Sequence, residues 1–166
     1  MGRRLDYVAE KGTFLLAILL FFLSCFVISN IHRSFIHVLT EYKYYFHDFS
    51  RFLEFVAVCG CMFFSVSGLA SSLLCAYGIV KRAENSVKVL TYYLCSLAVF
   101  IGSLGVTVFV MAYQEPVSPN MEARYNRERG LYYGITYVAI AQFVIYLAQM
   151  SYVAVESIQK SHIRLP

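Results

Sequence analysis

The chain has 166 residues, of which 59% are hydrophobic and 14% are charged, and its formal net charge at pH 7 is +4. Soluble domains average about 45–50% apolar and about 25% charged residues, so this composition excludes an ordinary soluble domain. The sequence has no long basic face that could follow a phosphate backbone, which argues against a nucleic-acid partner.

Four long stretches contain no Asp, Glu, Lys, Arg or His, and each has 19 to 26 residues. About 20 apolar residues in an α-helix cross a hydrocarbon core of roughly 30 Å. We therefore predict an all-α membrane protein, in which residues 1–166 form a single four-pass transmembrane domain surrounded by the lipid bilayer. The predicted spans are Gly12–Asn30, Phe55–Val80, Val89–Tyr113 and Leu131–Val155.

The first span is followed by a loop, residues 31–54, that is not rich in glycine or proline. Six apolar side chains recur in this loop at intervals of three or four residues, which predicts an amphipathic helix. This helix would lie on the outer leaflet or extend the second span outward. The histidines of the loop are spaced too loosely to predict a metal site. The six apolar side chains are Phe35, Leu39, Tyr42, Phe46, Phe49 and Leu53.

The second and third spans are joined by the short segment Lys81–Lys88, so the two helices are expected to be antiparallel neighbours. Both spans carry small residues at alternating intervals of three and four, and such seams let helix backbones approach each other in lipid. This spacing predicts a left-handed bundle with crossing angles of about +20°. The seam residues are Cys61, Ser65, Gly68, Ser72 and Cys75 in the second span and Cys95, Ala98, Gly102 and Gly105 in the third.

The fourth span places Gly134, Ala141 and Ala148 seven residues apart, and Gln142 and Gln149 lie beside the last two. Together the seams predict a left-handed antiparallel four-transmembrane-helix bundle. A buried amide in lipid needs a hydrogen-bond partner, and such a bond is worth about 0.6–2 kcal/mol. The glutamines are therefore predicted to contact another helix, either in the bundle or on a second protein. The functional alternative is that they line a polar path.

The basic residues are divided unevenly between the two sides of this topology. Eight lie on the side of the two chain ends and six on the other, and three of the eight are in the Lys81–Lys88 turn. By the positive-inside rule, both termini are expected in the cytoplasm. Tyrosines near the span ends, Tyr92 and Tyr93 among them, are predicted to be anchors in the headgroup layer.

The spans contain none of the ionisable groups that proton transfer, metal binding or ion-coupled transport generally require. The sequence also has no glycine-rich phosphate loop and no HExxH motif. We therefore expect neither an enzyme, nor a cofactor, nor a metal site. The five cysteines all lie within the spans, so no disulfide framework is expected outside the membrane.

The layout of the chain resembles that of the four-span claudin-like, peripheral-myelin-like and tetraspanin proteins. The shared features are a short first loop, a tight basic turn after the second span, and second and third spans rich in Gly, Ser and Cys. The segment from Cys75 to Asn85 resembles the end of the second tetraspanin span and its acidic-Asn turn. The chain lacks the tryptophan and loop cysteines of claudins and the large disulfide-bonded loop of tetraspanins. The resemblance implies a membrane organiser and assigns no functional residue.

The leading hypothesis is a non-enzymatic membrane protein that acts by lateral association with another integral membrane protein or with copies of itself. It would be an accessory subunit, an adhesion or junction organiser, or a trafficking partner, and the plasma membrane is favoured over an internal membrane. Gln142, Gln149 and the two outer loops are the candidate contacts. Two alternatives stay open: a pore-forming oligomeric channel lined by uncharged polar residues, and a membrane-embedded lipid or redox enzyme.

Overall fold

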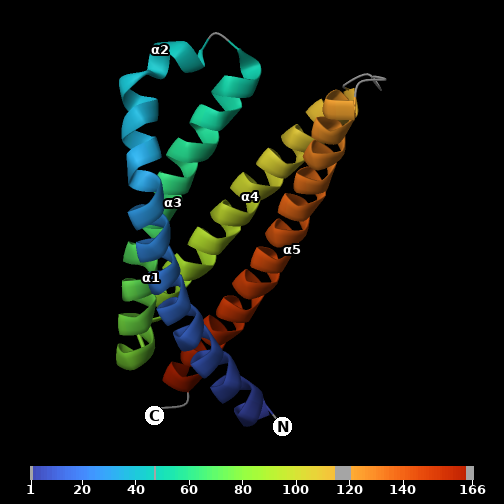
Figure 1. Ribbon diagram of the computed structural model, residues 1–166. Helices are drawn as coiled ribbons and strands as arrows, with labels where there is room; N and C mark the ends of the chain where they lie inside the picture. Colours follow the sequence, from blue (N-terminus) through green and yellow to red (C-terminus); the bar gives the residue numbers. More distant parts are fainter. Residues whose placement is uncertain (1, 47, 115–120, 164–166) are drawn as a thin grey trace. The chain divides into compact units, whose positions relative to one another are not determined.

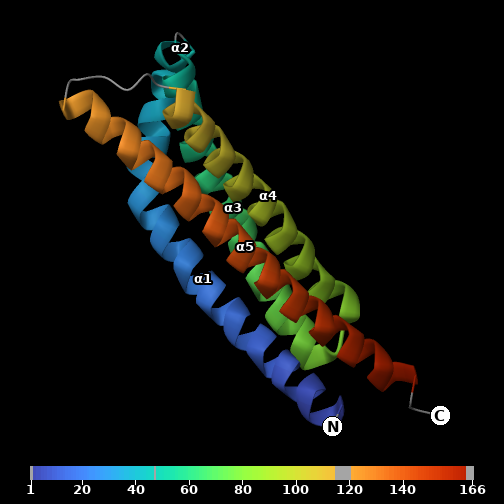
Figure 2. The same ribbon diagram turned by 90° about the vertical axis from the view of Figure 1, so that its right-hand side faces the viewer.

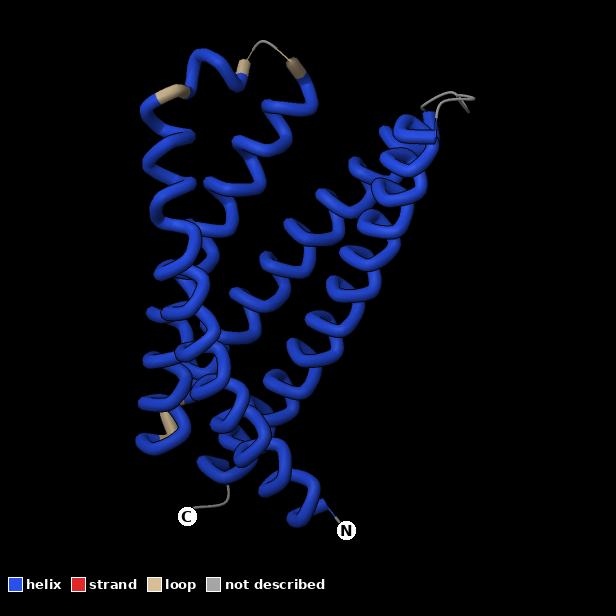
Figure 3. Tube along the Cα trace, in the orientation of Figure 1, coloured by secondary structure: helices blue, strands red, loops and turns tan. Residues whose placement is uncertain are grey.

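The structure is a computed structural model that describes residues 2–46, 48–114 and 121–163. These residues form five α-helices and no strand (Figure 1, Figure 3). Four of the helices, α1, α3, α4 and α5, are long and apolar enough to cross a membrane. The prediction of an all-helical integral membrane protein with four spanning helices is thus confirmed. The helices are α1 (Gly2–Thr40), α2 (Tyr42–Tyr45), α3 (Phe49–Lys81), α4 (Glu84–Gln114) and α5 (Met121–Ile163).

The helices extend beyond the charge-free stretches of the sequence. α1 has 39 residues. At a rise of 1.5 Å per residue it is about 58 Å long, almost twice the thickness of a hydrocarbon core. α3 has 33 residues, and the Asp48 side chain caps its start by accepting a hydrogen bond from the Ser50 amide at 3.4 Å. Helical structure therefore fills most of the loop predicted over residues 31–54.

The prediction of one amphipathic helix over this loop is wrong. α1 continues to Thr40 because residues 31–40 contain no glycine or proline that would end a helix at Asn30. Phe35 and Leu39 lie in the last turns of α1, whereas Phe49 and Leu53 lie in the first turns of α3. The alternative that the second span extends outward is therefore correct for these last two residues.

Aromatic side chains hold α2 against the start of α3. The ring centroids of Phe46 and Phe55 are 5.4 Å apart. The guanidinium carbon of Arg51 lies 3.8 Å from the ring centroid of Tyr44, which is a cation–π contact. Burial raises the pKa of the Tyr45 phenol above its ordinary value.

Contacts along the chain divide it into two compact units. Unit 1 comprises Met1–Tyr93 and Gln149–Pro166, and unit 2 comprises Leu94–Ala148. In unit 1, α1 and α3 lie side by side and run in opposite directions, as both views show (Figure 1, Figure 2). The first turns of α4 and the last turns of α5 also belong to unit 1. In unit 2, the remainders of α4 and α5 lie side by side and antiparallel (Figure 1, Figure 2).

α3 and α4 are joined by a tight turn. Arg82 has a left-handed backbone conformation (φ 54°), and it is the one non-glycine residue with positive φ among the described residues. Glycine is usual at such a helix end, because a side chain in this conformation costs about 1–2 kcal/mol. The Ala83 amide donates to the Gly78 carbonyl at 2.8 Å. A Cβ on Gly78 would lie 2.8 Å from the Ser86 Cβ, so glycine is what lets the chain reverse here.

Candidate functional site

Glu10 joins three parts of unit 1 through one carboxylate oxygen. Arg82 Nη1 donates to its Oε1 at 3.1 Å, and Ser157 Oγ donates to the same oxygen at 2.7 Å. We call these three residues the Glu10 junction. It connects α1 and α5 to the turn between α3 and α4. The Glu10 side chain is 14% exposed and that of Arg82 is 50% exposed, so the ion pair is open to screening on the arginine side only.

α1 and α3 keep a constant register from the Glu10 junction to the middle of unit 1. Gly68 of α3 faces Ser24 of α1, because a Cβ on Gly68 would lie 2.6 Å from the serine Oγ. Fourteen residues separate Glu10 from Ser24, and fourteen separate Gly68 from Arg82. The two helices therefore stay level with each other over about 21 Å, as straight antiparallel helices do.

Three helices meet at Gly68. Tyr93, in the early part of α4, donates from its hydroxyl to the Phe64 carbonyl of α3 at 2.9 Å. Phe64 lies one turn before Gly68, and a Cβ on this glycine would lie 2.8 Å from the tyrosine hydroxyl oxygen. The missing side chain thus lets the tyrosine reach the carbonyl. Tyr93 is 8% exposed, so the prediction that it is an anchor in the headgroup layer is wrong.

The interior of unit 1 is rich in hydroxyl groups. Seven polar side chains are buried in the part of the chain that the structure describes, and all seven belong to unit 1. Ser65 donates to the Cys61 carbonyl of its own helix, whereas Thr91 and Ser151 bond to each other between α4 and α5 at 2.9 Å. A hydroxyl bond between two helices, such as that of Thr91 with Ser151, connects them without any buried charge. The seven buried side chains are those of Thr13, Ser24, Ser65, Ser71, Ser72, Ser151 and Ser157.

Replacing Gly68 with alanine is expected to destabilise unit 1 by about 1–3 kcal/mol, because the new methyl group overlaps Ser24 Oγ and the Tyr93 hydroxyl. A second change, Ser24→Ala, removes the nearer of these two oxygens and should restore part of the loss. The measurement is the unfolding midpoint of the purified protein in mixed detergent micelles. If the double variant is no more stable than Gly68→Ala alone, the contact between α1 and α3 is contradicted.

In unit 2, α4 and α5 approach each other through glycines. A Cβ on Gly134 would lie 2.6 Å from the Phe109 Cβ and 2.8 Å from the Phe109 Cα. A Cβ on Gly105 would lie 3.0 Å from the Gly134 carbonyl oxygen. Backbone therefore lies directly against backbone, as in helix pairs that associate through small residues in membranes. At Gly102 the nearest atom is the Ala141 Cβ, at an ordinary contact distance of 3.5 Å.

The predicted seam residues differ in their surroundings. The second and third spans are predicted to be antiparallel neighbours, each with a seam of small residues that allows close approach. Within its own unit, Gly68 faces Ser24 of α1, and Gly105 faces Gly134 of α5. The buried seam residues are Ser65, Gly68, Ser72, Cys75, Ala98, Gly105, Gly134, Ala141 and Ala148, whereas Cys61 and Gly102 are half-buried and Cys95 is exposed. A seam interval thus marks residues that can lie close to a neighbour without identifying that neighbour.

The two glutamines of α5 face outward. Gln142 and Gln149 are both exposed, and neither makes a hydrogen bond with the described part of the chain. Residues 115–120, between α4 and α5, lie outside the described residues, as does His47 in the loop after α1.

The polar contacts of Glu10 and Ser24 are not predicted from the sequence. Glu10 lies two residues before the first charge-free stretch, and Ser24 interrupts an apolar run within it. Both features are local signals of a polar contact at a helix surface. No local signal relates Glu10 to Arg82 or Ser157, because these residues are far apart in the sequence.

Among the residues that the structure describes, no three His, Cys, Asp or Glu side chains are placed so that they could hold a metal ion. The five cysteines are free thiols, and Cys75 is fully buried. No protein-family model, curated protein or solved structure matches the chain.

Proposed function

We propose that this chain is a non-enzymatic four-pass membrane protein that acts by lateral association with another integral membrane protein or with copies of itself. The observation that supports this most is the outward-facing amide of Gln142. This residue lies near the middle of the charge-free stretch Leu131–Val155 and makes no hydrogen bond with the described residues. An amide exposed to lipid lacks the partner that water would supply, so a second helix that bonds it gains about 0.6–2 kcal/mol.

In this proposal the four spans form a left-handed antiparallel bundle. The heptad intervals of the small residues support this handedness. The pairing of α1 with α3 and of α4 with α5 supports an antiparallel order. The outer surface of the spans carries large exposed apolar side chains, Phe22, Phe63 and Phe143 among them, which suit contact with lipid or with another apolar helix.

The protein would act in the plasma membrane, with both termini in the cytoplasm. The basic turn between α3 and α4 favours this orientation. An accessory subunit, a junction organiser and a trafficking partner all use such lateral contacts. The resemblance in layout to the four-span membrane organisers supports the same role.

Replacing Gln142 and Gln149 together with leucine is expected to weaken this association about threefold to thirtyfold, because each lost amide bond is worth about 0.6–2 kcal/mol and only part of the pair need be engaged. The measurement is the amount of partner, or of a differently tagged second copy, that co-purifies in mild detergent. Thr136→Val is the matched control, since the Thr136 hydroxyl already donates to the Tyr132 carbonyl of its own helix at 2.8 Å.

A monomer with no co-purifying partner, together with unchanged behaviour of the double leucine variant, would contradict lateral association. Reproducible unitary currents from the protein reconstituted in planar bilayers would support the pore-forming oligomer instead.

A further inference from the structure

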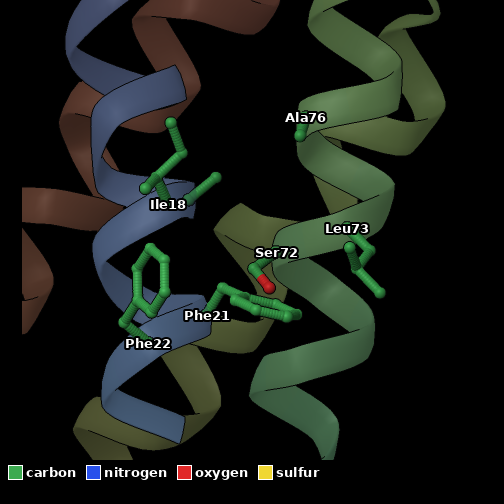
Figure 4. A pocket seen from close by; sticks show the side chains of 7 residues that line it. Ile18, Phe21, Phe22, Ser72, Leu73 and Ala76 are labelled. Atoms are coloured by element: carbon green, nitrogen blue, oxygen red, sulfur yellow. The ribbon is translucent and has the colours of Figure 1, made fainter. Parts of the chain in front are cut away.

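A groove opens on the surface of unit 1 between α1 and α3 (Figure 4). Ile18, Phe21 and Phe22 of α1 form one wall, and Leu73 and Ala76 of α3 belong to the other. The only polar side chain of the lining is that of Ser72, which donates its hydroxyl to the Leu69 carbonyl of its own helix at 2.8 Å. The groove therefore presents an apolar lining to any molecule that enters it.

The groove lies at the depth of a single leaflet. On α1, six residues separate Lys11 from Ala17, the first lining residue, and on α3 five separate Ala76 from Lys81. At 1.5 Å per residue, the groove begins about 8–9 Å from the level of the two lysines. It extends to Phe22, about 16 Å from that level, and half of a roughly 30 Å hydrocarbon core is about 15 Å. An acyl chain of the leaflet on the side of the chain ends covers this range.

The size of the groove suits one chain. Its volume is about 210 Å³. Pockets that enclose a drug-sized ligand have volumes of roughly 300–1,000 Å³, so a bulky ring system would not be enclosed here. A single hydrocarbon chain, laid along the two helices, needs less room and no polar partner.

Two exposed lysines stand at the headgroup end of the groove. Lys11 precedes Ile18 by seven residues and Phe22 by eleven, so all three lie on one face of α1. Lys81, the last residue of α3, is exposed and makes no ion pair with the described residues. Arg82 beside it is already engaged by Glu10. A phosphate and a carboxylate, or a phosphate alone, would complement the positive charge at this level.

We infer that the groove between α1 and α3 binds one acyl chain of an anionic glycerophospholipid, whose headgroup contacts Lys11 and Lys81. The lipid comes from the leaflet on the side of the two chain ends. Its apolar chain covers the lining residues of both helices, and its charge selects it over a neutral lipid of the same chain length.

The test uses the full chain in phosphatidylcholine nanodiscs that contain a minor fraction of a photoreactive lipid. The probe is either phosphatidylserine or phosphatidylcholine with the same diazirine-bearing acyl chain, and labelled residues are mapped by mass spectrometry. Labelling of the segments that contain Phe21 and Leu73 should be stronger with the phosphatidylserine probe, by about fivefold for each lysine that contacts the headgroup. Lys11→Gln with Lys81→Gln should abolish the preference, whereas Lys43→Gln, in the first outer loop, should keep it.

A second variant tests the groove itself. Ala76→Phe fills it and should remove most of the labelling, whereas Ala70→Phe places the same side chain on an exposed position of α3 outside the lining. Equal labelling by both probes would overturn the inference, and so would labelling that survives Ala76→Phe. Folding of Ala76→Phe is judged by its elution from a sizing column. If it does not fold, the lysine variants alone decide whether the preference for the phosphatidylserine probe depends on Lys11 and Lys81.

Discussion

Replacing Gly134 with alanine is expected to force α4 and α5 apart and to destabilise unit 2 by about 1–3 kcal/mol. The added Cβ would lie 2.6 to 2.9 Å from the Cβ, Cα and amide nitrogen of Phe109. Two of these three atoms belong to the backbone, so a change of rotamer cannot relieve the overlap. The measurement is the detergent-unfolding midpoint, together with the yield of a cysteine cross-link between the two helices.

Gly102→Ala is the matched control for this prediction, because it adds the same methyl group to the same helix pair. Its Cβ would lie 3.5 Å from that of Ala141, an ordinary van der Waals contact. Its unfolding midpoint should stay within the error of the unchanged protein. If the two alanine variants were equally stable, the close backbone contact between α4 and α5 would be refuted.

Replacing Glu10 with alanine is expected to loosen the contacts of α1 and α5 with the turn between α3 and α4. The change removes hydrogen bonds from Arg82 and Ser157 at once and leaves the arginine without its acidic partner. A buried ion pair broken from one side loses about 3–5 kcal/mol, but Arg82 is half exposed, so we expect a loss of about 1–2 kcal/mol. Faster proteolysis in the turn between α3 and α4, and a lower unfolding midpoint, would report this loosening.

Glu156→Ala provides the control for the Glu10 junction. Glu156 pairs with Lys160 at 3.5 Å along one helix, and both side chains are well exposed. Exposed pairs of this kind contribute about 0.3–0.5 kcal/mol, so the control should change the midpoint little. Glu10→Gln, which keeps an oxygen that can accept from Ser157, should lose less than Glu10→Ala. Equal effects of Glu10→Ala and Glu156→Ala would mean that the junction does not connect the helices.

The four spans could be predicted because the absence of charge over 19 or more residues is a local property of the sequence. The ends of the helices could not, since nothing in residues 31–40 ends a helix and α1 simply continues through them. The position of Tyr93 near a span end predicts a place in the headgroup layer. Position along a helix does not determine which side of it a residue occupies, and Tyr93 lies on the buried side.

The candidate site was predicted only in part. The intervals of the small residues select Gly105 and Gly134, both of which lie at the close contact between α4 and α5. They do not predict that the neighbour of Gly134 is the backbone of Phe109, since a seam of small residues suggests a small neighbour. The Glu10 junction depends on the register between α1 and α3, and that register is a property of packing, not of spacing within either helix.

α1 has no proline and runs unbroken from Gly2 to Thr40. Sharp kinks in helices arise mainly at prolines, at Gly/Ser pairs or at bulges. α1 is therefore expected to move largely as one straight helix. A force that tilts the Thr40 end of α1 would therefore displace its Gly2 end as well. Such a displacement would draw Glu10, which lies near the Gly2 end, away from Arg82 and Ser157. A single unbroken helix thus connects the segment near Thr40 with the Glu10 junction.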